Sequence, residues 1–378
     1  MKYDLNNVMS QFSVYGEYLI GVPYGTGHIN DTFQVTFDQG GTIVHYILQR
    51  VNTNVFRKPE ELMENFVRVT GHIGRKIREE RKLHPETRHR TLEVVPARDG
   101  KPFVRDAAGN FFRCYVFVEN ARTYDILETT DQAYQAAAAF GRFQADLADL
   151  DGRLHETIPN FHNTPSRLAA LEQAVKEDRA GRLKQVAPEL DFILARRDEA
   201  SRLIDLQAAG ELTERTTHND TKLNNVLLDP QTGCAKCVLD LDTVMPGLSA
   251  YDFGDGVRFG ASSAAEDEKD LDQVWLKLDM YQAFLEGYLD ACGHALTPKE
   301  IEVLPLGAKI ITAELAMRFL KDYLDGDVYF KIDYPTQNLD RCRTQLKLVA
   351  DMEAKWPEMQ RILHETAAVR CAQPTTPQ

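Results

Sequence analysis

The chain has 378 residues, and at roughly 100–200 residues per domain this length predicts about two domains or lobes. Hydrophobic residues make up 43% and charged residues 27%, which excludes a disordered, collagen-like or coiled-coil protein. The net charge of −13 disfavours nucleic acid and anionic membranes as partners, because both are polyanions. No apolar run reaches the ~18 residues of a membrane helix. The first residues do not resemble a secretory signal, so we expect a cytoplasmic protein.

The first 118 residues are predicted to form a β-rich lobe. Alternating and β-branched residues predict five strands, over 17–23, 32–37, 42–51, 91–95 and 113–118. A glycine turn at 24–27 separates the first two strands. A helix is expected over 59–78, because its apolar residues recur at spacings of three and four.

The rest of the chain is mostly helical in pattern. Six helices are predicted, over 131–150, 165–177, 187–207, 268–289, 298–324 and 338–356. Two short segments, 226–228 and 236–241, are predicted strands. The sequence therefore predicts an α+β fold with an N-terminal lobe of residues 1–118, a connector of 119–122 and a helical lobe of 123–378. A ligand site is expected between the lobes.

The segment His218–Asn225 carries the strongest chemical motif. It matches H-x-D-x-x-x-x-N, the frame of a kinase catalytic loop. Phosphoryl transfer needs a carboxylate that orients and deprotonates the attacking hydroxyl, and this is the predicted role of Asp220. Asn225 is a predicted Mg²⁺ ligand, and Lys222 could balance charge that develops on the phosphate. The alternative is an ordinary polar loop, in which Asp and Asn favour turns.

A predicted hairpin follows the loop. Residues 225–229 and 235–241 are expected to pair about a turn near Thr232, which would place Asn225 opposite Asp240. Two oxygen ligands at one end of a hairpin suit Mg²⁺, which takes few protein ligands in addition to substrate phosphates. Asp242 is expected on the same strand face, where it would join the metal site or touch the acceptor.

The tripeptide Asp252-Phe253-Gly254 has the letters of the protein-kinase metal motif. It follows Asp220 by 32 residues, whereas Asp240 follows by 20 and lies at the end of the hairpin. We therefore predict that Asp240 binds the metal and that Asp252 supports the catalytic loop by hydrogen bonds.

The glycine turn contains Gly25, Thr26 and Gly27 between two strands. Such a turn lets backbone N–H groups approach phosphates. No helix follows it, so a dinucleotide-binding or Walker loop is disfavoured. A plain hairpin is the alternative, but the accompanying catalytic and metal residues make these three residues predicted nucleotide contacts.

Together these motifs resemble the aminoglycoside phosphotransferase-like kinases and, more narrowly, the bacterial N-acetylhexosamine 1-kinases. The resemblance covers most of the chain and rests on Tyr24–Asn30, Tyr46–Gln49, Thr217–Asn225, Leu239–Gly247, Asp252–Ala261 and Met317–Leu320. It implies a two-lobed protein-kinase-like fold. It also implies ATP- and Mg²⁺-dependent phosphorylation of N-acetylglucosamine or N-acetylgalactosamine at the anomeric hydroxyl. By this resemblance Asp220 is the base, and Asn225 and Asp240 hold Mg²⁺.

The third predicted strand departs from most kinases at one position. Gln49 stands where most kinases carry a lysine that contacts the nucleotide phosphates. Ile47 and Gln49 share a strand face, so Ile47 is expected to line the adenine pocket and Gln49 to point at the phosphates. Arg50 is expected to face the opposite way. Adenine is expected beside Phe117 and Glu119 of the connector.

The candidate acceptor contacts are His28, Asp242, Arg258, Arg318 and Tyr329. Carboxylates, arginines and aromatic faces commonly hold sugars, and Arg318 and Tyr329 match positions that resemble the family's sugar-binding residues. For Arg318 the alternative is an ion pair within its own helix, with Glu314 or Asp322.

Two alternatives to an N-acetylhexosamine kinase stay open at this point. One is a kinase of the same family with another acceptor, such as an aminoglycoside, choline or another sugar. The other is an ATP-binding module without catalysis, because Gln49 replaces the usual lysine. The expected ligands are small molecules in each case, and the oligomeric state is undefined.

Overall fold

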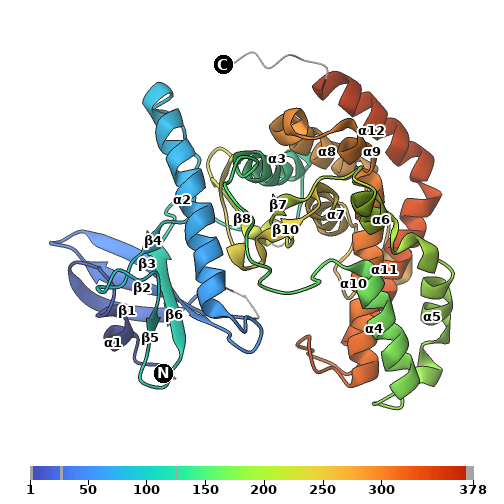
Figure 1. Ribbon diagram of the computed structural model, residues 1–378, viewed down its shortest axis with the longest axis horizontal. Coiled ribbons are helices and arrows are strands. Elements are labelled where there is room, and N and C mark those ends of the chain that lie inside the picture. Colours follow the sequence, from blue (N-terminus) through green and yellow to red (C-terminus); the bar gives the residue numbers. More distant parts are fainter. Residues whose placement is uncertain (1–2, 26–28, 125, 372–378) are drawn as a thin grey trace.

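The computed structural model describes residues 3–25, 29–124 and 126–371 and has two lobes (Figure 1). The N-terminal lobe is built on a six-stranded sheet, and the C-terminal lobe is mostly helical, as the sequence predicts. In the described part of the chain, no helix is both long enough and apolar enough to cross a membrane.

The strands of the N-terminal sheet run in the order β1-β2-β3-β6-β4, and β5 pairs with β6. Their bounds are β1 (Glu17–Pro23), β2 (Asp31–Asp38), β3 (Ile43–Val51), β4 (Val94–Val95), β5 (Val104–Arg105) and β6 (Phe111–Val116). Phe33, Val35 and Phe37 of β2 alternate into the core, where they join the short helix α1 (Leu5–Met9). All pairs are antiparallel, and β6 lies beside β3 although 59 residues separate them in sequence.

The long helix α2 (Pro59–Leu83) packs on the sheet and runs five residues beyond its predicted end (Figure 1). It begins with a proline, whose missing N–H is tolerated in a first helical turn. Its apolar residues Leu62, Phe66, Val69 and Ile73 are buried, as their spacing predicts.

The C-terminal lobe contains the remaining elements. Its helices are α3 (Thr130–Asp146), α4 (Thr164–Glu177), α5 (Ala187–Leu194), α6 (Arg202–Ala208), α7 (Ser249–Gly260), α8 (Leu278–Cys292), α9 (Pro298–Glu302), α10 (Leu304–Asp325), α11 (Gln337–Ala354) and α12 (Trp356–Arg370). Two short pairs complete it: β7 (Arg215–Thr217) with β10 (Met245–Gly247), and β8 (Val226–Leu228) with β9 (Ala235–Val238).

Several helix predictions need correction. The predicted helix 187–207 is divided into α5 and α6, and the predicted helix 298–324 breaks at Val303. Pro305 begins a new first turn there, because it has no N–H to continue the preceding helix. The first ten residues of the predicted helix 268–289 lie outside α8. Helix α12 was not predicted, nor was α7, whose three glycines lower its helix propensity.

Helices α7 and α10 cross at a point where both carry glycine. A Cβ atom added to Gly254 would lie 2.5 Å from the carbonyl oxygen of Gly307, so neither helix has room for a side chain there. The two backbones are therefore in direct contact. This crossing matters for the site, because Asp252 lies on α7 and Arg318 lies on α10.

Candidate active site

The loop His218–Asn225 joins β7 to β8 and is supported by Asp252 of α7. The two carboxylate oxygens of Asp252 accept the backbone N–H groups of His218 (2.8 Å) and Asn219 (2.7 Å). Its carbonyl oxygen accepts a hydrogen bond from the Thr221 hydroxyl at 2.6 Å. The prediction that Asp252 supports the catalytic loop by hydrogen bonds is confirmed.

Asp220 lies in this loop beside Lys222 and Asn225. Lys222 Nζ is 3.1 Å from one carboxylate oxygen, and Asn225 Nδ2 donates to the other at 3.1 Å. Burial raises the pKa of Asp220, but the charges of Lys222 and His218 outweigh this effect, so the pKa lies below its ordinary value. The carboxylate is therefore ionised at neutral pH. Its side chain is 24% exposed, so a hydroxyl group can reach it.

The hairpin β8–β9 differs from its prediction by one residue. Val226 pairs with Val238 instead of Leu239, because Leu228 pairs with Ala235 and the turn is therefore centred earlier than predicted. A β-bulge between Leu227 and Leu228 recovers only part of this difference. Leu239 therefore lies opposite Asn225 and donates its N–H to the Asn225 carbonyl at 2.8 Å. Asp240 follows with a left-handed φ of 53°, which ends the strand.

Asp240 lies among other negative charges. Desolvation of the carboxylate and the negative charges of Asp242 and Asp220 raise the pKa of Asp240 to about 6. A divalent cation would relieve this concentration of negative charge. Among the described residues, no three His, Cys, Asp or Glu side chains could hold a metal alone. Mg²⁺ would therefore need nucleotide phosphates in addition to Asn225 and Asp240.

The placement of Asp242 corrects a prediction. It lies in the 3₁₀ turn Leu241–Thr243, not on a strand face with Asp240. One carboxylate oxygen is 2.5 Å from Arg113 Nη1, and the other accepts a hydrogen bond from Asn30 Nδ2 at 2.7 Å. Because partners from the N-terminal lobe occupy both oxygens, we assign Asp242 to the contact between the lobes instead of the metal or the acceptor.

Arg113 of β6 is the residue that the sequence reasoning missed. It lies opposite Gln49 of β3 and donates to Gln49 Oε1 from Nε (2.9 Å) and from Nη2 (2.6 Å). A signal was present, because Arg113 interrupts the mostly apolar strand Phe111–Val116. An arginine in a buried strand must find partners for its charge.

The predicted adenine site lies beside an aromatic cluster. The ring of Phe117 contacts Tyr24 and His45, with ring centroids 5.5 and 5.8 Å away. Glu119 Oε1 lies 2.6 Å from His45 Nδ1, which fixes the chain just after the sheet. Ile47 is buried within the sheet nearby.

Other nucleotide-side predictions have mixed outcomes. Arg50 faces away from Gln49, as predicted, and its Nε donates to Asp31 at 2.7 Å. Gly25 has a φ of +77°, which glycine adopts without strain. The predicted contacts Thr26, Gly27 and His28 lie outside the described residues.

Arg318 of α10 does not form the ion pair that the sequence left open. Within the described part of the chain, the carboxylates of Glu314 and Asp322 bond to other groups, and neither pairs with Arg318. The guanidinium carbon of Arg318 instead lies 5.3 Å from the ring centroid of Phe161 and 6.0 Å from that of Tyr329. The structure thus brings Arg318 and Tyr329 together.

Asp322 shapes the segment that carries Tyr329. Its carboxylate accepts the backbone N–H groups of Val328 (3.0 Å), Tyr329 (2.8 Å) and Phe330 (2.9 Å). Asp322 is buried, whereas Tyr329 is 57% exposed. Tyr329 therefore projects into solvent from a backbone that is held in place.

A buried pair connects α10 to the catalytic loop. Glu314 Oε1 lies 2.9 Å from His162 Nδ1, and His162 Nε2 lies 3.1 Å from the carbonyl oxygen of Asn219. Burial lowers the pKa of His162, but the charge of Glu314 outweighs this effect and the pKa is raised. Both ring nitrogens can then donate. Arg318, one turn after Glu314, is thus connected to the residue that precedes Asp220.

Arg258 is buried in an ion-pair cluster. Its Nε and Nη2 donate to Asp255 at 3.0 and 2.9 Å, and Nη1 donates to Glu266 at 2.8 Å. All three nitrogens therefore bind protein groups. We assign Arg258 a structural role in place of the predicted acceptor contact.

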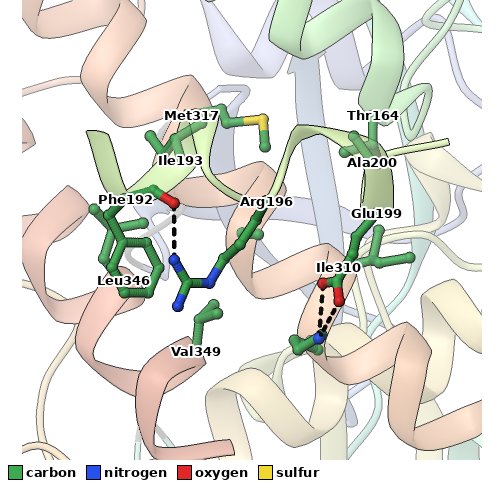
Figure 2. Close-up of a pocket in the computed structure, with 12 residues that line it drawn as sticks. Thr164, Phe192, Ile193, Arg196, Glu199, Ala200, Ile310, Met317, Leu346 and Val349 are labelled. Atoms are coloured by element: carbon green, nitrogen blue, oxygen red, sulfur yellow. Dashed lines mark hydrogen bonds and ion pairs between the residues drawn. The ribbon is translucent and has the colours of Figure 1, made fainter. Parts of the chain in front are cut away.

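Figure 2 shows a separate cavity between α5, α10 and α11. Its lining includes Ile193, Met317 and Val349, and Arg196 at its side donates to the carbonyl oxygen of Phe192 at 2.9 Å. A volume of ≈ 20 Å³ holds about one water molecule. This cavity is therefore too small for a nucleotide or a sugar.

The two-lobed fold and the loop around Asp220 define a kinase-like enzyme, and solved structures share this fold. An aminoglycoside phosphotransferase from Alicyclobacillus acidocaldarius is 13% identical, with 95% of this chain and 96% of that chain covered and a TM-score of 0.57. Choline kinase from Cryptosporidium parvum is 12% identical, with 96% and 98% covered and a TM-score of 0.58. Spectinomycin phosphotransferase in complex with ADP and spectinomycin is 14% identical, with 96% and 97% covered and a TM-score of 0.51.

Sequence comparison identifies the family itself. A model of the phosphotransferase enzyme family matches residues 21–286, and the chain belongs to this family. It is therefore an enzyme, a small-molecule kinase that transfers phosphate to a hydroxyl group.

Proposed function

We propose that the protein transfers the γ-phosphoryl group of ATP to the anomeric hydroxyl of N-acetylglucosamine or N-acetylgalactosamine. The observation that carries the proposal is the cluster of Asp220, Lys222 and Asn225, an ionised carboxylate flanked by a cation and an amide. Family membership supports the phosphoryl transfer. The segments that resemble N-acetylhexosamine 1-kinases support the acceptor and its 1-hydroxyl.

In this proposal Asp220 accepts the proton of the acceptor hydroxyl as its oxygen attacks the γ-phosphorus in line. The new O–P bond forms as the bond to ADP breaks, and the products are a hexosamine 1-phosphate and ADP. Lys222 orients Asp220 and offsets negative charge on the transferred group. Asn225 and Asp240 would hold Mg²⁺, which neutralises phosphate charge when it is bound.

The nucleotide is proposed to lie between the lobes. Its adenine would contact Ile47 and Phe117, beside Glu119, and its phosphates would lie near Gly25 and Gln49. The aromatic cluster around Phe117 supports the first placement, because adenine stacks on aromatic rings. The ADP in the solved spectinomycin phosphotransferase supports ATP as the donor.

The charge of the acceptor side favours a neutral sugar over a cationic acceptor. Arg167 donates to the Phe161 carbonyl from Nε and Nη2, and the guanidinium carbon of Arg318 lies 5.3 Å from the ring centroid of Phe161, so two arginines flank this residue. Phe161 and Tyr329 offer aromatic faces beside Arg318. A sugar can accept hydrogen bonds from an arginine and pack on these rings, whereas a cationic acceptor would meet like charge.

A kinase with a cationic acceptor is the second candidate, because solved relatives include a choline kinase and an aminoglycoside phosphotransferase. One assay separates the two. ADP release from Mg·ATP is measured with N-acetylglucosamine, N-acetylgalactosamine, glucose, galactose, choline and kanamycin, and ³¹P NMR locates the phosphate on any product. We expect turnover with the N-acetylhexosamines and phosphate on the anomeric oxygen. Turnover with choline or kanamycin alone would overturn the acceptor assignment.

A further inference from the structure

The cation that most kinases carry on the third strand has a counterpart on the neighbouring strand of this protein. Gln49 is uncharged, and Arg113 lies directly opposite it in the β3–β6 register. We propose that Arg113 is a positioning residue that replaces the strand lysine, because it orients the Gln49 amide and holds Asp242 of the C-terminal lobe against the sheet. This inference rests on the proposed nucleotide site.

Arg113 determines the orientation of the Gln49 amide. Nε and Nη2 of Arg113 both donate to Gln49 Oε1, at 2.9 and 2.6 Å. The amide nitrogen therefore points the other way and donates to Thr32 Oγ1 at 2.9 Å. An amide nitrogen carries two N–H groups, so the second one stays available for an anionic ligand. Two donors on Gln49 Oε1 fix the orientation of the amide more firmly than a single hydrogen bond would.

The third nitrogen of Arg113 contacts the other lobe. Nη1 lies 2.5 Å from Asp242 Oδ1, and Asn30 Nδ2 donates to Asp242 Oδ2 at 2.7 Å. Asn30 is itself fixed, because its Oδ1 accepts the backbone N–H of Asn52 at 2.9 Å. Two side chains of the N-terminal lobe therefore hold one carboxylate of the C-terminal lobe.

Burial makes this arrangement sensitive to the loss of either charge. The side chains of Arg113 and Asp242 are only 2% and 3% exposed. The guanidinium carbon also lies 4.6 Å from the ring centroid of Phe66, which limits the directions that Arg113 can take. A buried charge without its partner is strongly unfavourable, so the lobes cannot separate here without losing that stabilisation.

Asp242 transmits this restraint to the reacting groups. The 3₁₀ turn Leu241–Thr243 directly follows Asp240, so the position of Asp242 limits the position of Asp240. Thr243 Oγ1 donates to the His218 carbonyl at 2.7 Å, which connects the same turn to the catalytic loop. A lysine on the third strand would contact the phosphates directly. Arg113 acts one step further away, through Gln49 and Asp242.

The test moves the charge back to the third strand. Arg113→Gln removes the cation, and the double variant Gln49→Lys with Arg113→Gln places a cation on β3. Calorimetry gives the dissociation constant of Mg·ADP, and steady-state kinetics give kcat and KM with ATP and N-acetylglucosamine. We expect Arg113→Gln to weaken Mg·ADP binding and lower kcat/KM by about 10- to 100-fold, the usual cost of losing a supporting residue. We expect the double variant to regain most of the Mg·ADP affinity.

Two further variants serve as controls. Arg113→Lys keeps the charge but cannot serve Gln49 and Asp242 at once, so we expect a smaller loss of Mg·ADP affinity with the fold retained. Arg196→Gln removes another arginine that pairs with a carboxylate through two bonds, to Glu353 at 2.9 and 2.6 Å. It lies outside this network and is expected to leave Mg·ADP affinity unchanged.

Two results would overturn the inference. One is unchanged Mg·ADP affinity in a folded Arg113 variant. The other is a loss that Gln49→Lys does not relieve, which would make Arg113 a packing residue only. If the wild-type protein phosphorylates no N-acetylhexosamine, the acceptor proposal fails, while the Mg·ADP constants still decide the role of Arg113.

Discussion

The catalytic loop and the segment that carries Tyr329 are held in the same way but present different surfaces. A helix aspartate accepts backbone N–H groups in each: Asp252 of α7 accepts two, and Asp322 of α10 accepts three. These carboxylates satisfy donors that an irregular segment cannot satisfy by itself. The catalytic loop is mostly buried, whereas Val328 and Tyr329 are exposed.

Under the proposed function, this difference separates the chemistry from the choice of acceptor. The backbone of the catalytic loop cannot change without disturbing the core, because His218, Asn219 and Thr221 are buried. The second segment has a fixed backbone with side chains that are free to vary. Substitutions in the first region should therefore lower kcat, and substitutions in the second should raise the acceptor KM.

The largest effect is expected for Asp220→Asn. An amide cannot accept the hydroxyl proton, so kcat should fall by ~10²-fold or more, the lower bound typical for loss of a general base. Steady-state kinetics measure the loss, and thermal unfolding with Mg·ADP titration shows whether fold and nucleotide binding are kept. Near-wild-type turnover by a folded variant would contradict the assignment of the base.

The matched variants Asp252→Asn and Asp322→Asn test the comparison directly. Each replaces one accepting oxygen with an N–H group that faces a backbone N–H, which should lower the free energy of unfolding by about 1–3 kcal/mol. We expect Asp252→Asn to lower kcat by about tenfold, equivalent to ~1.4 kcal/mol of activation free energy. Asp322→Asn should raise only the acceptor KM. Equal losses of kcat in both variants would break the comparison.

Arg318→Met tests the exposed side of the comparison. It keeps an apolar stem but removes the guanidinium group, so the acceptor KM should rise by about tenfold, the cost of a charged hydrogen bond, with the ATP KM unchanged. Lys321→Met is the control on the same helix, because Lys321 pairs with Asp325 instead of the aromatic cluster. An unchanged acceptor KM for Arg318→Met would leave Arg318 with a structural role.

The smallest effect concerns the buried pair that joins the two regions. Because the pKa of His162 is raised in the folded protein, protonated His162 stabilises the fold fully below its ordinary pKa of 6.5. This stabilisation is lost as pH rises through the folded-state pKa of His162. Burial raises the pKa of Glu314, but the charge of His162 outweighs this and lowers it. The stabilisation from ionised Glu314 is present above its ordinary pKa of 4.5 and is lost as pH falls through its folded-state pKa. The pair should therefore stabilise the protein most between these two values.

Urea unfolding of the wild type and of the double variant His162→Gln, Glu314→Gln, from about pH 4 to about pH 9, measures this effect. The difference in unfolding free energy should be largest in weakly acidic solution and decrease towards high pH. A difference that does not vary with pH would contradict the charged state of the pair.

Features of the fold and of the candidate site that depend on local sequence patterns were mostly predicted from the sequence. The bounds of β1 agree with the prediction, and the spacing of Asp220, Asp240 and Asp252 was enough to assign Asp252 to loop support. These features depend on residues close in sequence or on a motif with fixed spacing. The same is true of the division into a β-rich lobe and a helical lobe.

What the sequence did not predict depends on contacts between distant residues. Arg113 meets Gln49 only because β6 adds to the sheet beside β3, and no local pattern encodes that pairing. Leu239 takes the place predicted for Asp240 opposite Asn225 because the turn of β8–β9 is centred earlier than predicted, and alternation of apolar residues does not fix the centre of a turn. Asp242 was misplaced because its strand ends at Val238, earlier than predicted, and Asp242 lies in the 3₁₀ turn that follows.

The glycine crossing of α7 and α10 has a consequence for attempts to change the acceptor. Gly254 and Gly307 bring the backbones of α7 and α10 into contact. The distance between α7, which carries Asp252, and α10, which carries Arg318, is therefore set by backbone contact and not by side chains at the crossing. A library that randomises residues 328–330 would therefore vary the proposed acceptor surface while the position of Asp220 stays constant. Alanine at either glycine would force the helices apart and displace the proposed acceptor contacts relative to Asp220, so laboratory evolution should leave both positions untouched.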